Sequence, residues 1–127
     1  MEITMARLQF MGVQKGTFDP YQGKHDPVFA RNLKPDEIVP SCGFGALIAQ
    51  GSRPMRGKVY VTAIRLGFVT DQGQPWAIEW AEMHSLDVKT GLLGGTAWVD
   101  SKTYGRWGVD STKAILRDIG NTWANIH

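Results

Sequence analysis

The sequence predicts a single, mostly β domain of seven strands followed by one C-terminal α-helix. The length of 127 residues suits one domain, because a second core would leave each half too little apolar surface to bury. Fifteen glycines, six prolines and five tryptophans favour short strands and tight turns over a helical bundle. From residue 57 onward, polar and apolar residues alternate with a period close to two, which is typical of strands.

The seven expected strands follow one another along the chain with turns between them. The first, at residues 37–50, is long, and Gly43 and Gly45 within it indicate a bulge or a sharp curl. The next two lie within residues 57–68 and meet at a tight corner near residues 62–63. Gly, Pro and Asp residues mark the later turns, which leave four further strands at residues 76–80, 83–90, 96–100 and 103–109.

After Val109 the period of the apolar residues changes to that of a helix, which runs to the end of the chain. One apolar stripe joins residues three, four and three positions apart: Leu116, Ile119, Trp123 and Ile126. Asp110 or Ser111 is expected as the N-cap, because its side-chain oxygen can accept from the first unpaired amides. Gly120 costs a helix about 1 kcal/mol relative to alanine, and a close approach of helix to sheet is expected to compensate.

The single cysteine and the N-terminal residues indicate where the protein works. Cys42 cannot form an intramolecular disulfide, which excludes a secreted scaffold held by crosslinks and indicates a reducing compartment. On an apolar strand it is expected to be a small core residue. Glu2 and Arg7 interrupt the apolar run that a signal peptide needs, and no stretch reaches the length of a membrane span. We therefore expect a cytoplasmic protein without a transmembrane segment.

The stretch from Gly57 to Phe68, Gly-Lys-Val-Tyr-Val-Thr-Ala-Ile-Arg-Leu-Gly-Phe, resembles the GRAM and bacterial branch of the pleckstrin-homology-like superfamily. The shared pattern is a glycine, a short apolar strand, threonine, two residues, arginine, an apolar residue, any residue and phenylalanine. Thr62 and Arg65 can hold the corner between two strands through side-chain hydrogen bonds. Residues 33–37 and 76–83 are similar to the lead-in and to the following strand and turn of such domains.

This resemblance covers about residues 33–126 and implies a bent, seven-stranded antiparallel sheet or barrel capped by the C-terminal amphipathic helix. Residues 33–127 are accordingly the pleckstrin-homology-like domain, and residues 1–32 an N-terminal extension that acts as arm or lid. The resemblance also implies binding of lipids, peptides or identical subunits, and it transfers no catalytic residues. We predict a non-catalytic module that acts through a protein partner or through self-association, without a cofactor.

The N-terminal extension carries apolar groups without an obvious strand of its own. Residues 1–11 suit a short helix or an added strand, and residues 12–27 have the composition of a loop. Its exposed apolar groups must pack on the barrel or on a partner. The candidate residues of a partner-binding arm are Phe18, Tyr21 and Phe29.

A basic cluster suggests an alternative function, peripheral binding of anionic lipid or phosphate. The net charge of +2 is too small to indicate nucleic-acid binding, but no acidic residue lies between Glu37 and Asp71. In lipid-binding members of the superfamily a basic cluster lies in the loop between the first two strands. In this sequence residues 53–58 fall in that loop, although no lysine closes the preceding strand. The candidate anion-binding residues are Arg53, Arg56 and Lys58; the simpler interpretation is a strand edge protected from aggregation by cations.

Groups suited to catalysis or metal binding are sparse. His84 lies between Glu82 and Asp87, but residues 82 and 84 share a strand face in any case, and a surface pair is the simpler interpretation. Three residues within eight positions offer metal donors, although their spacing matches no known site and a hydrated loop is expected: Asp19, His25 and Asp26. We predict no catalytic residue and no metal ligand, and keep a hydrolase as a minor alternative.

The aromatic residues are expected in the core and not on a nucleic-acid surface. Tyr104, Arg106 and Trp107 lie close together, but Trp107 leaves the strand face that the other two share, so they do not form one stacking platform. Five tryptophans would fill much of a small barrel: Trp76, Trp80, Trp98, Trp107 and Trp123. Nucleic acid is therefore not an expected partner.

Overall fold

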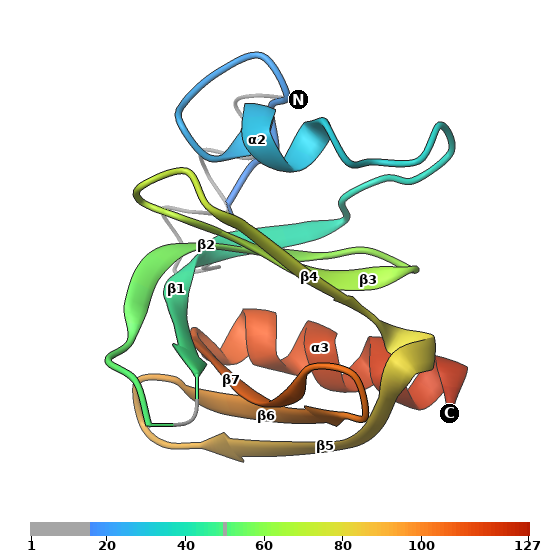
Figure 1. The fold of residues 1–127 in the computed structure, drawn as a ribbon. Helices are drawn as coiled ribbons and strands as arrows, with labels where there is room; N and C mark the ends of the chain where they lie inside the picture. The colour runs from blue at the N-terminus through green and yellow to red at the C-terminus, as the bar shows by residue number, and fades with distance from the viewer. Residues whose placement is uncertain (1–15, 50) are drawn as a thin grey trace.

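Seven strands and a C-terminal helix make up most of the chain, of which the computed structural model describes residues 16–49 and 51–127 (Figure 1). The elements are α2 (Asp26–Ala30), β1 (Ser41–Ala49), β2 (Met55–Val61), β3 (Arg65–Thr70), β4 (Pro75–Glu79), the 3-10 turn η1 (Trp80–Glu82), β5 (Met83–Thr90), β6 (Gly95–Ser101), β7 (Gly105–Ser111) and α3 (Lys113–Ile126). The mostly β fold class predicted from the sequence is confirmed.

All seven strands belong to one antiparallel sheet in the order β4-β3-β2-β1-β7-β6-β5. The central strand, β1, pairs with β2 over residues 41–47 but with β7 only over residues 45–49. Because these two ranges are offset, β1 passes from one half of the sheet to the other, and the sheet curls into a half-barrel (Figure 1). Helix α3 lies between the two halves and closes one side (Figure 1).

A glycine of β1 allows a neighbouring strand to approach closely, but β1 has no bulge at the glycines where one was expected. Gly43 and Gly45 pair in unbroken register with Val59 and Gly57, and the shift of register lies instead in β5, between Met83 and Ser85. A Cβ on Gly45 would lie 2.1 Å from the backbone oxygen of Asp110, closer than any real contact. Gly45 therefore permits the close approach of β7 at the point where β1 joins the two halves.

The corner between β2 and β3 is held by Thr62 and Arg65, as expected from the sequence. Thr62 Oγ1 accepts hydrogen bonds from the backbone amides of Ile64 and Arg65 and donates one to Glu37 Oε2 (2.7 Å). The Arg65 guanidinium binds both carboxylate oxygens of Glu37 at 2.9 Å. Glu37 is thus a buried residue of the segment before β1, and the strand begins at Ser41 and not at residue 37 as predicted.

The Glu37 site makes stability depend on pH. Burial alone would raise the pKa of Glu37, but hydrogen bonds from Thr62, the Lys34 amide and Arg65 outweigh it and hold the pKa below its ordinary value of 4.5. The unfolded chain then binds this proton more readily, so the stabilisation is complete at neutral pH and is lost as the pH falls below 4.5. In urea unfolding, Glu37→Gln is expected to be less stable than the natural chain at neutral pH, with the difference shrinking in acid. A difference that grows in acid would contradict this assignment.

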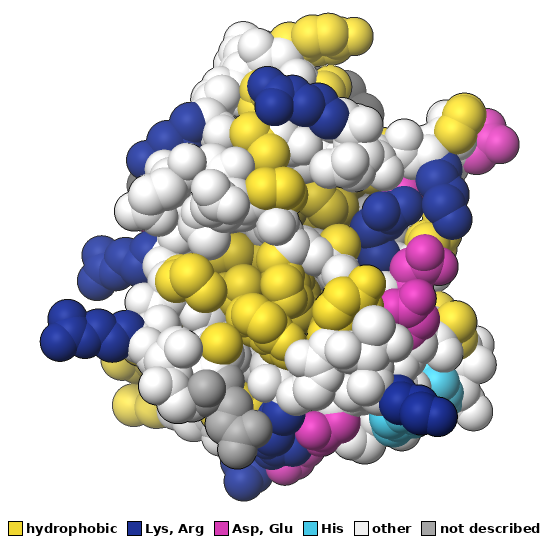
Figure 2. Space-filling model, viewed as in Figure 1, with side chains coloured by type: hydrophobic (Ala, Val, Ile, Leu, Met, Phe, Trp, Pro, Cys, Tyr) yellow, Lys and Arg dark blue, Asp and Glu magenta, His cyan; other side chains and the backbone are white. Residues whose placement is uncertain are grey.

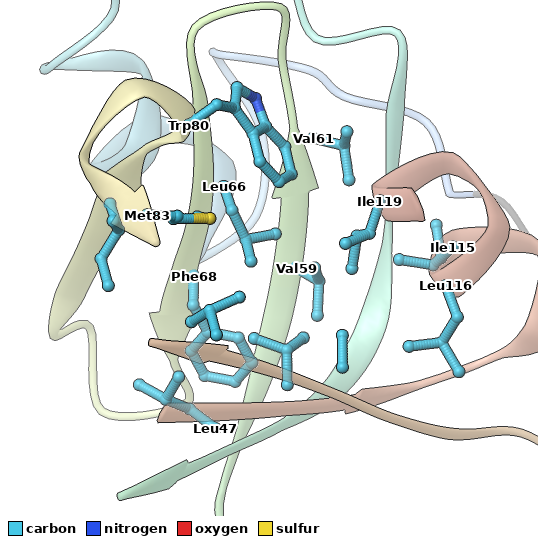
Figure 3. Packing of buried hydrophobic residues seen from close by; sticks show 14 residues of the cluster. Leu47, Val59, Val61, Leu66, Phe68, Trp80, Met83, Ile115, Leu116 and Ile119 are labelled. Carbon is cyan, nitrogen blue, oxygen red and sulfur yellow. The ribbon is translucent and has the colours of Figure 1, made fainter. Parts of the chain in front are cut away.

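The core lies between the two halves of the sheet and α3. Figure 3 shows Ile115, Leu116 and Ile119 pointing from α3 toward Val59 and Val61 of β2, and all five side chains are buried. The same cluster contains Leu47, Leu66, Phe68, Ile78, Trp80, Met83, Ala97, Val99 and Val109. Burial of this apolar surface is the main force that docks the helix on the sheet.

Trp80 is the tryptophan that is fully buried in the core, and its Nε1 donates a hydrogen bond to the backbone oxygen of Thr62 (2.8 Å). Trp76 and Trp107 pack with ring centroids 5.5 Å apart and join β4 to β7. Figure 2 shows hydrophobic side chains gathered in the middle of this face of the molecule. Trp123 is partly buried against the core and stacks on His127. Trp98 contradicts the prediction, because its ring lies outside the barrel against Gly108 and beneath the Arg106 guanidinium.

Two expectations about the C-terminal helix are wrong. Thr112 is the N-cap and accepts from the Ile115 amide, because β7 continues through Ser111 and keeps the two residues before Thr112 in the sheet. A Cβ on Gly120 would meet no described atom within 4 Å apart from those of its own helix turns, so no close approach of the sheet explains this glycine. Across residues 16–49 and 51–127, α3 included, no helix has the length and apolar content needed to cross a membrane.

The segment before β1, residues 16–40 and named here the covering segment, packs on the outer face of the β1–β3 half of the sheet. Gly16 donates a backbone hydrogen bond to Cys42, and Phe29 of α2 packs so close to Gly67 that a Cβ there would lie 2.2 Å from the ring. Phe29, Cys42, Tyr60 and Val69 form this second buried cluster. Residues 57–61 of β2 are therefore buried on both faces, not on one. The helix or strand expected at residues 1–11 lies outside the described residues.

Candidate binding groove

A groove of about 900 Å³, named here the β1 groove, crosses the outer face of β1. Cys42, Phe44 and Ala46 share this face, since residues two apart on a strand point the same way. The covering segment buries Cys42 but leaves Phe44, at the floor of the groove, 68% exposed. One wall is formed by the segment before α2, by β2 and by the β3–β4 turn, and contains Lys24, His25, Arg56 and Asp71. The other wall is formed by the β5–β6 turn and the end of β7, and contains Leu93, Gly94, Asp110 and Thr112.

Hydrogen bonds hold the first wall together and fix the second wall to the floor. His25 Nε2 lies 2.8 Å from Asp71 Oδ1, and this contact ties the start of α2 to the β3–β4 turn. The hydrogen bond with His25 is the main cause that lowers the pKa of Asp71. On the other side, Ser111 Oγ donates to the Phe44 oxygen (2.9 Å). In Figure 1 the β5–β6 turn lies at the lower left and the segment before α2 at the upper left, with β1 and β2 between them.

The three residues of the predicted basic cluster do not converge on one site. Arg53 is exposed in the β1–β2 loop, and Arg56 is exposed on β2 and lines the β1 groove. Lys58 is buried: its Nζ lies 2.8 and 3.0 Å from the two carboxylate oxygens of Asp26 and donates to the Thr17 oxygen. Asp26 thus neutralises the innermost of the three charges.

The candidate arm residues also separate. Phe29 is buried and stacks on Tyr60 with ring centroids 4.2 Å apart, and Phe18 packs edge-on against both rings. Tyr21 is 91% exposed. Two of the three therefore pack on the sheet of their own chain, and Tyr21 alone of the three faces away from it.

Asp26 organises the contact between the covering segment and the sheet. Its carboxylate accepts hydrogen bonds from Tyr60 Oη, Lys58 Nζ and the Asp19 amide. Burial and the hydrogen bond to Asp26 both raise the pKa of Tyr60. The expectation of a hydrated loop at Asp19, His25 and Asp26 is therefore wrong for His25 and Asp26, because both side chains are buried. Among the described residues, no group of three or more metal-binding side chains is placed to hold an ion.

The other candidate chemical groups lie apart from the groove. His84 is exposed on the edge strand β5, and Glu82 and Asp87 are exposed as well. These residues therefore lie on the surface, as predicted. Cys42 is buried as predicted, although in the outer cluster and not in the barrel, and burial raises the pKa of its thiol to about 11. At neutral pH this cysteine is a protonated, unreactive side chain.

Sequence reasoning missed the apolar residues of the groove. The sequence pattern places Phe44 in an expected strand and Leu92 and Leu93 in an expected turn, without indicating that the two leucines are 88% and 92% exposed. A signal was available, because two adjacent leucines between glycines in a short turn cannot reach the core that their strands enclose.

Comparison with known proteins gives a fold and no function. No family model matches this chain, and no curated protein matches it. Among solved structures, the chain is similar to the crystal structure of the C-terminal domain of an unknown protein from Leishmania infantum, with a TM-score of 0.58 and 14% sequence identity. The match covers 77% of this chain and 90% of that chain. At this identity the likeness shows a shared fold alone.

Proposed function

We propose that this chain is a non-catalytic binding module of the pleckstrin-homology-like type, and that a protein partner binds in the β1 groove. The order of seven antiparallel strands and a C-terminal helix supports the resemblance of its sequence to that superfamily. The observation that carries the proposal is Phe44, a large apolar side chain 68% exposed at the floor of a groove. Burying a phenylalanine or leucine side chain contributes about 1.5–3 kcal/mol, which a partner segment in the groove would gain.

Several of the side chains suited to chemistry hold the structure, which supports a non-catalytic function. His25 is paired with Asp71, Lys58 and Tyr60 are bound to Asp26, and the Cys42 thiol is buried and protonated. A buried reduced cysteine is also compatible with the cytoplasmic location that we propose.

Anionic lipid or phosphate binding is the weaker alternative. Of the three residues proposed for it, Lys58 is held by a buried carboxylate, and Arg56 shares its groove with Asp71 and Asp110. A phosphate group needs several converging donors, and this surface mixes both signs of charge.

Site-specific photocrosslinking in cells tests the proposal. A photoreactive phenylalanine analogue in place of Phe44 is expected to form covalent adducts with a protein. The same analogue in place of Tyr104, an exposed residue of the β6–β7 loop, is the matched control and should form none. Equal adducts at both positions, or none at position 44, would contradict the groove as the binding site. Binding to acidic vesicles that Arg53→Ala/Arg56→Ala abolishes would favour the lipid alternative instead.

A further inference from the structure

The β5–β6 turn presents two leucines at the rim of the β1 groove. Leu92 and Leu93 are nearly fully exposed, and Leu93 lines the groove. The turn is closed by a hydrogen bond from the Gly91 amide to the Gly94 oxygen (2.6 Å). Gly94 lies so close to β7 that a Cβ on it would be 2.5 Å from the backbone oxygen of Ser111. The turn is thus held against the end of β7, and its two leucines remain exposed at the rim of the groove.

A projection and a hollow therefore lie side by side on one surface. The projection is the Leu92-Leu93 turn, and the hollow is the β1 groove with Phe44 at its floor. Such a surface is complementary to itself, because a two-fold axis places each projection in the hollow of the other copy. Both copies then make identical contacts, and the assembly closes as a dimer instead of growing into a filament.

The charges around the groove have the same self-complementary arrangement. Ala46 on β1 lies directly opposite Arg56 on β2 and directly opposite Asp110 on β7, so Arg56 and Asp110 flank it on one face of the sheet. Strands are spaced by about 4.8 Å, so these opposite charges start from backbone positions about 10 Å apart. A two-fold axis that runs parallel to β1, above its outer face at Ala46, brings Arg56 of each copy over Asp110 of the other.

We infer that the partner in the β1 groove is a second copy of this chain, an inference that rests on the proposed function. Leu92 and Leu93 of each copy contact Phe44 of the other, and Arg56 of each copy pairs with Asp110 of the other. The apolar contacts supply the affinity, and the charge pairs select the two-fold orientation, because like charges face each other in the other alignments.

Sedimentation equilibrium of the purified full chain tests this directly. The natural chain is expected to have twice its monomer mass of 14.1 kDa. Leu92→Ser/Leu93→Ser is expected to weaken the dimer by about 100-fold or more, because four leucine contacts are lost across the interface. Ile38→Ser is the matched control, since Ile38 is an equally aliphatic, 73% exposed residue outside the groove, and it should leave the dimer unchanged.

Charge reversal tests the orientation independently of folding. Arg56→Glu alone and Asp110→Arg alone each place like charges together and should give monomers, whereas the double variant should restore the dimer. Restoration in the double variant also shows that neither single change acts by unfolding the chain.

Two outcomes would overturn the inference, and they are distinct from failure of the proposed function. A natural chain that stays monomeric at all concentrations overturns it, as does a dimer that Leu92→Ser/Leu93→Ser leaves intact. If position 44 then crosslinks to a different protein in cells, the groove is a binding site for another partner and only the self-association is wrong.

Discussion

Asp26→Ala is expected to lower the free energy of unfolding by about 3–5 kcal/mol, because it leaves the Lys58 ammonium buried without its counter-charge. The two side chains are 7% and 10% exposed, and the Lys58 nitrogen lies 2.8 Å from the nearer carboxylate oxygen. Tyr60 Oη and the Asp19 amide lose the same acceptor. Urea unfolding followed by tryptophan fluorescence measures the loss, with the midpoint falling at unchanged slope.

Two further variants separate the buried charge from a general loss of contacts. Asp26→Ala/Lys58→Met removes both charges and fills the space with an apolar side chain, so it should recover much of the loss. Asp36→Ala changes an exposed aspartate of the same segment and should shift stability by no more than about 0.5 kcal/mol. If the double variant is as unstable as Asp26→Ala alone, the unpaired lysine is not the cause.

The strands and the helix could be predicted because their signals are local. Apolar residues at every second position define strands, and the change to a helical spacing after Val109 defines α3. The corner at Thr62 and Arg65 could be predicted because the residues that form it are three positions apart. The exact start of α3 could not, since Asp110, Ser111 and Thr112 all suit an N-cap, and only pairing of Ser111 with Gly45 and Gly95 decides between them.

The second layer of the fold could not be predicted, because alternation along a strand identifies one apolar face but not what covers the other. Lys58 and Gly67 have the composition of a solvent-facing surface, yet both lie beneath the covering segment. The contact joins Asp26 to a lysine 32 positions away in the sequence, and no local pattern records it. The same limit applies to Trp98. Its neighbours Ala97 and Val99 face the core, so the Trp98 ring lies on the outside of the sheet, over Gly108.

The candidate groove depends on that second layer. Its floor is the part of the outer face of β1 that the covering segment leaves open, and one wall is the segment itself. Sequence reasoning identified Arg56 but placed it with Arg53 and Lys58, because the three are close in sequence. In the fold, the neighbours of Arg56 across the strands are Ala46 and Asp71, which come from elements before and after it.

Phe29 is the apolar anchor that holds this segment on the sheet. Its ring stacks on Tyr60 with an interplanar angle of 6° and lies against Gly67, which has no side chain to displace it. Phe18 packs edge-on against it at 6.3 Å between centroids. The segment therefore docks through one aromatic cluster beside the buried Asp26 carboxylate, and loss of the central ring leaves a cavity that its neighbours cannot fill.

Phe29→Ala is accordingly expected to cost about 3–5 kcal/mol in the free energy of unfolding, with faster amide exchange in residues 16–32 than in β6 or α3. Tyr21→Ala is the matched control: it removes an aromatic ring from the same segment, but one that is 91% exposed, and should change stability by no more than about 0.5 kcal/mol. Gly67→Val tests the same contact from the sheet side, since its added side chain must displace the Phe29 ring. Equal effects of Phe29→Ala and Tyr21→Ala would mean that the segment is not docked on the sheet through Phe29.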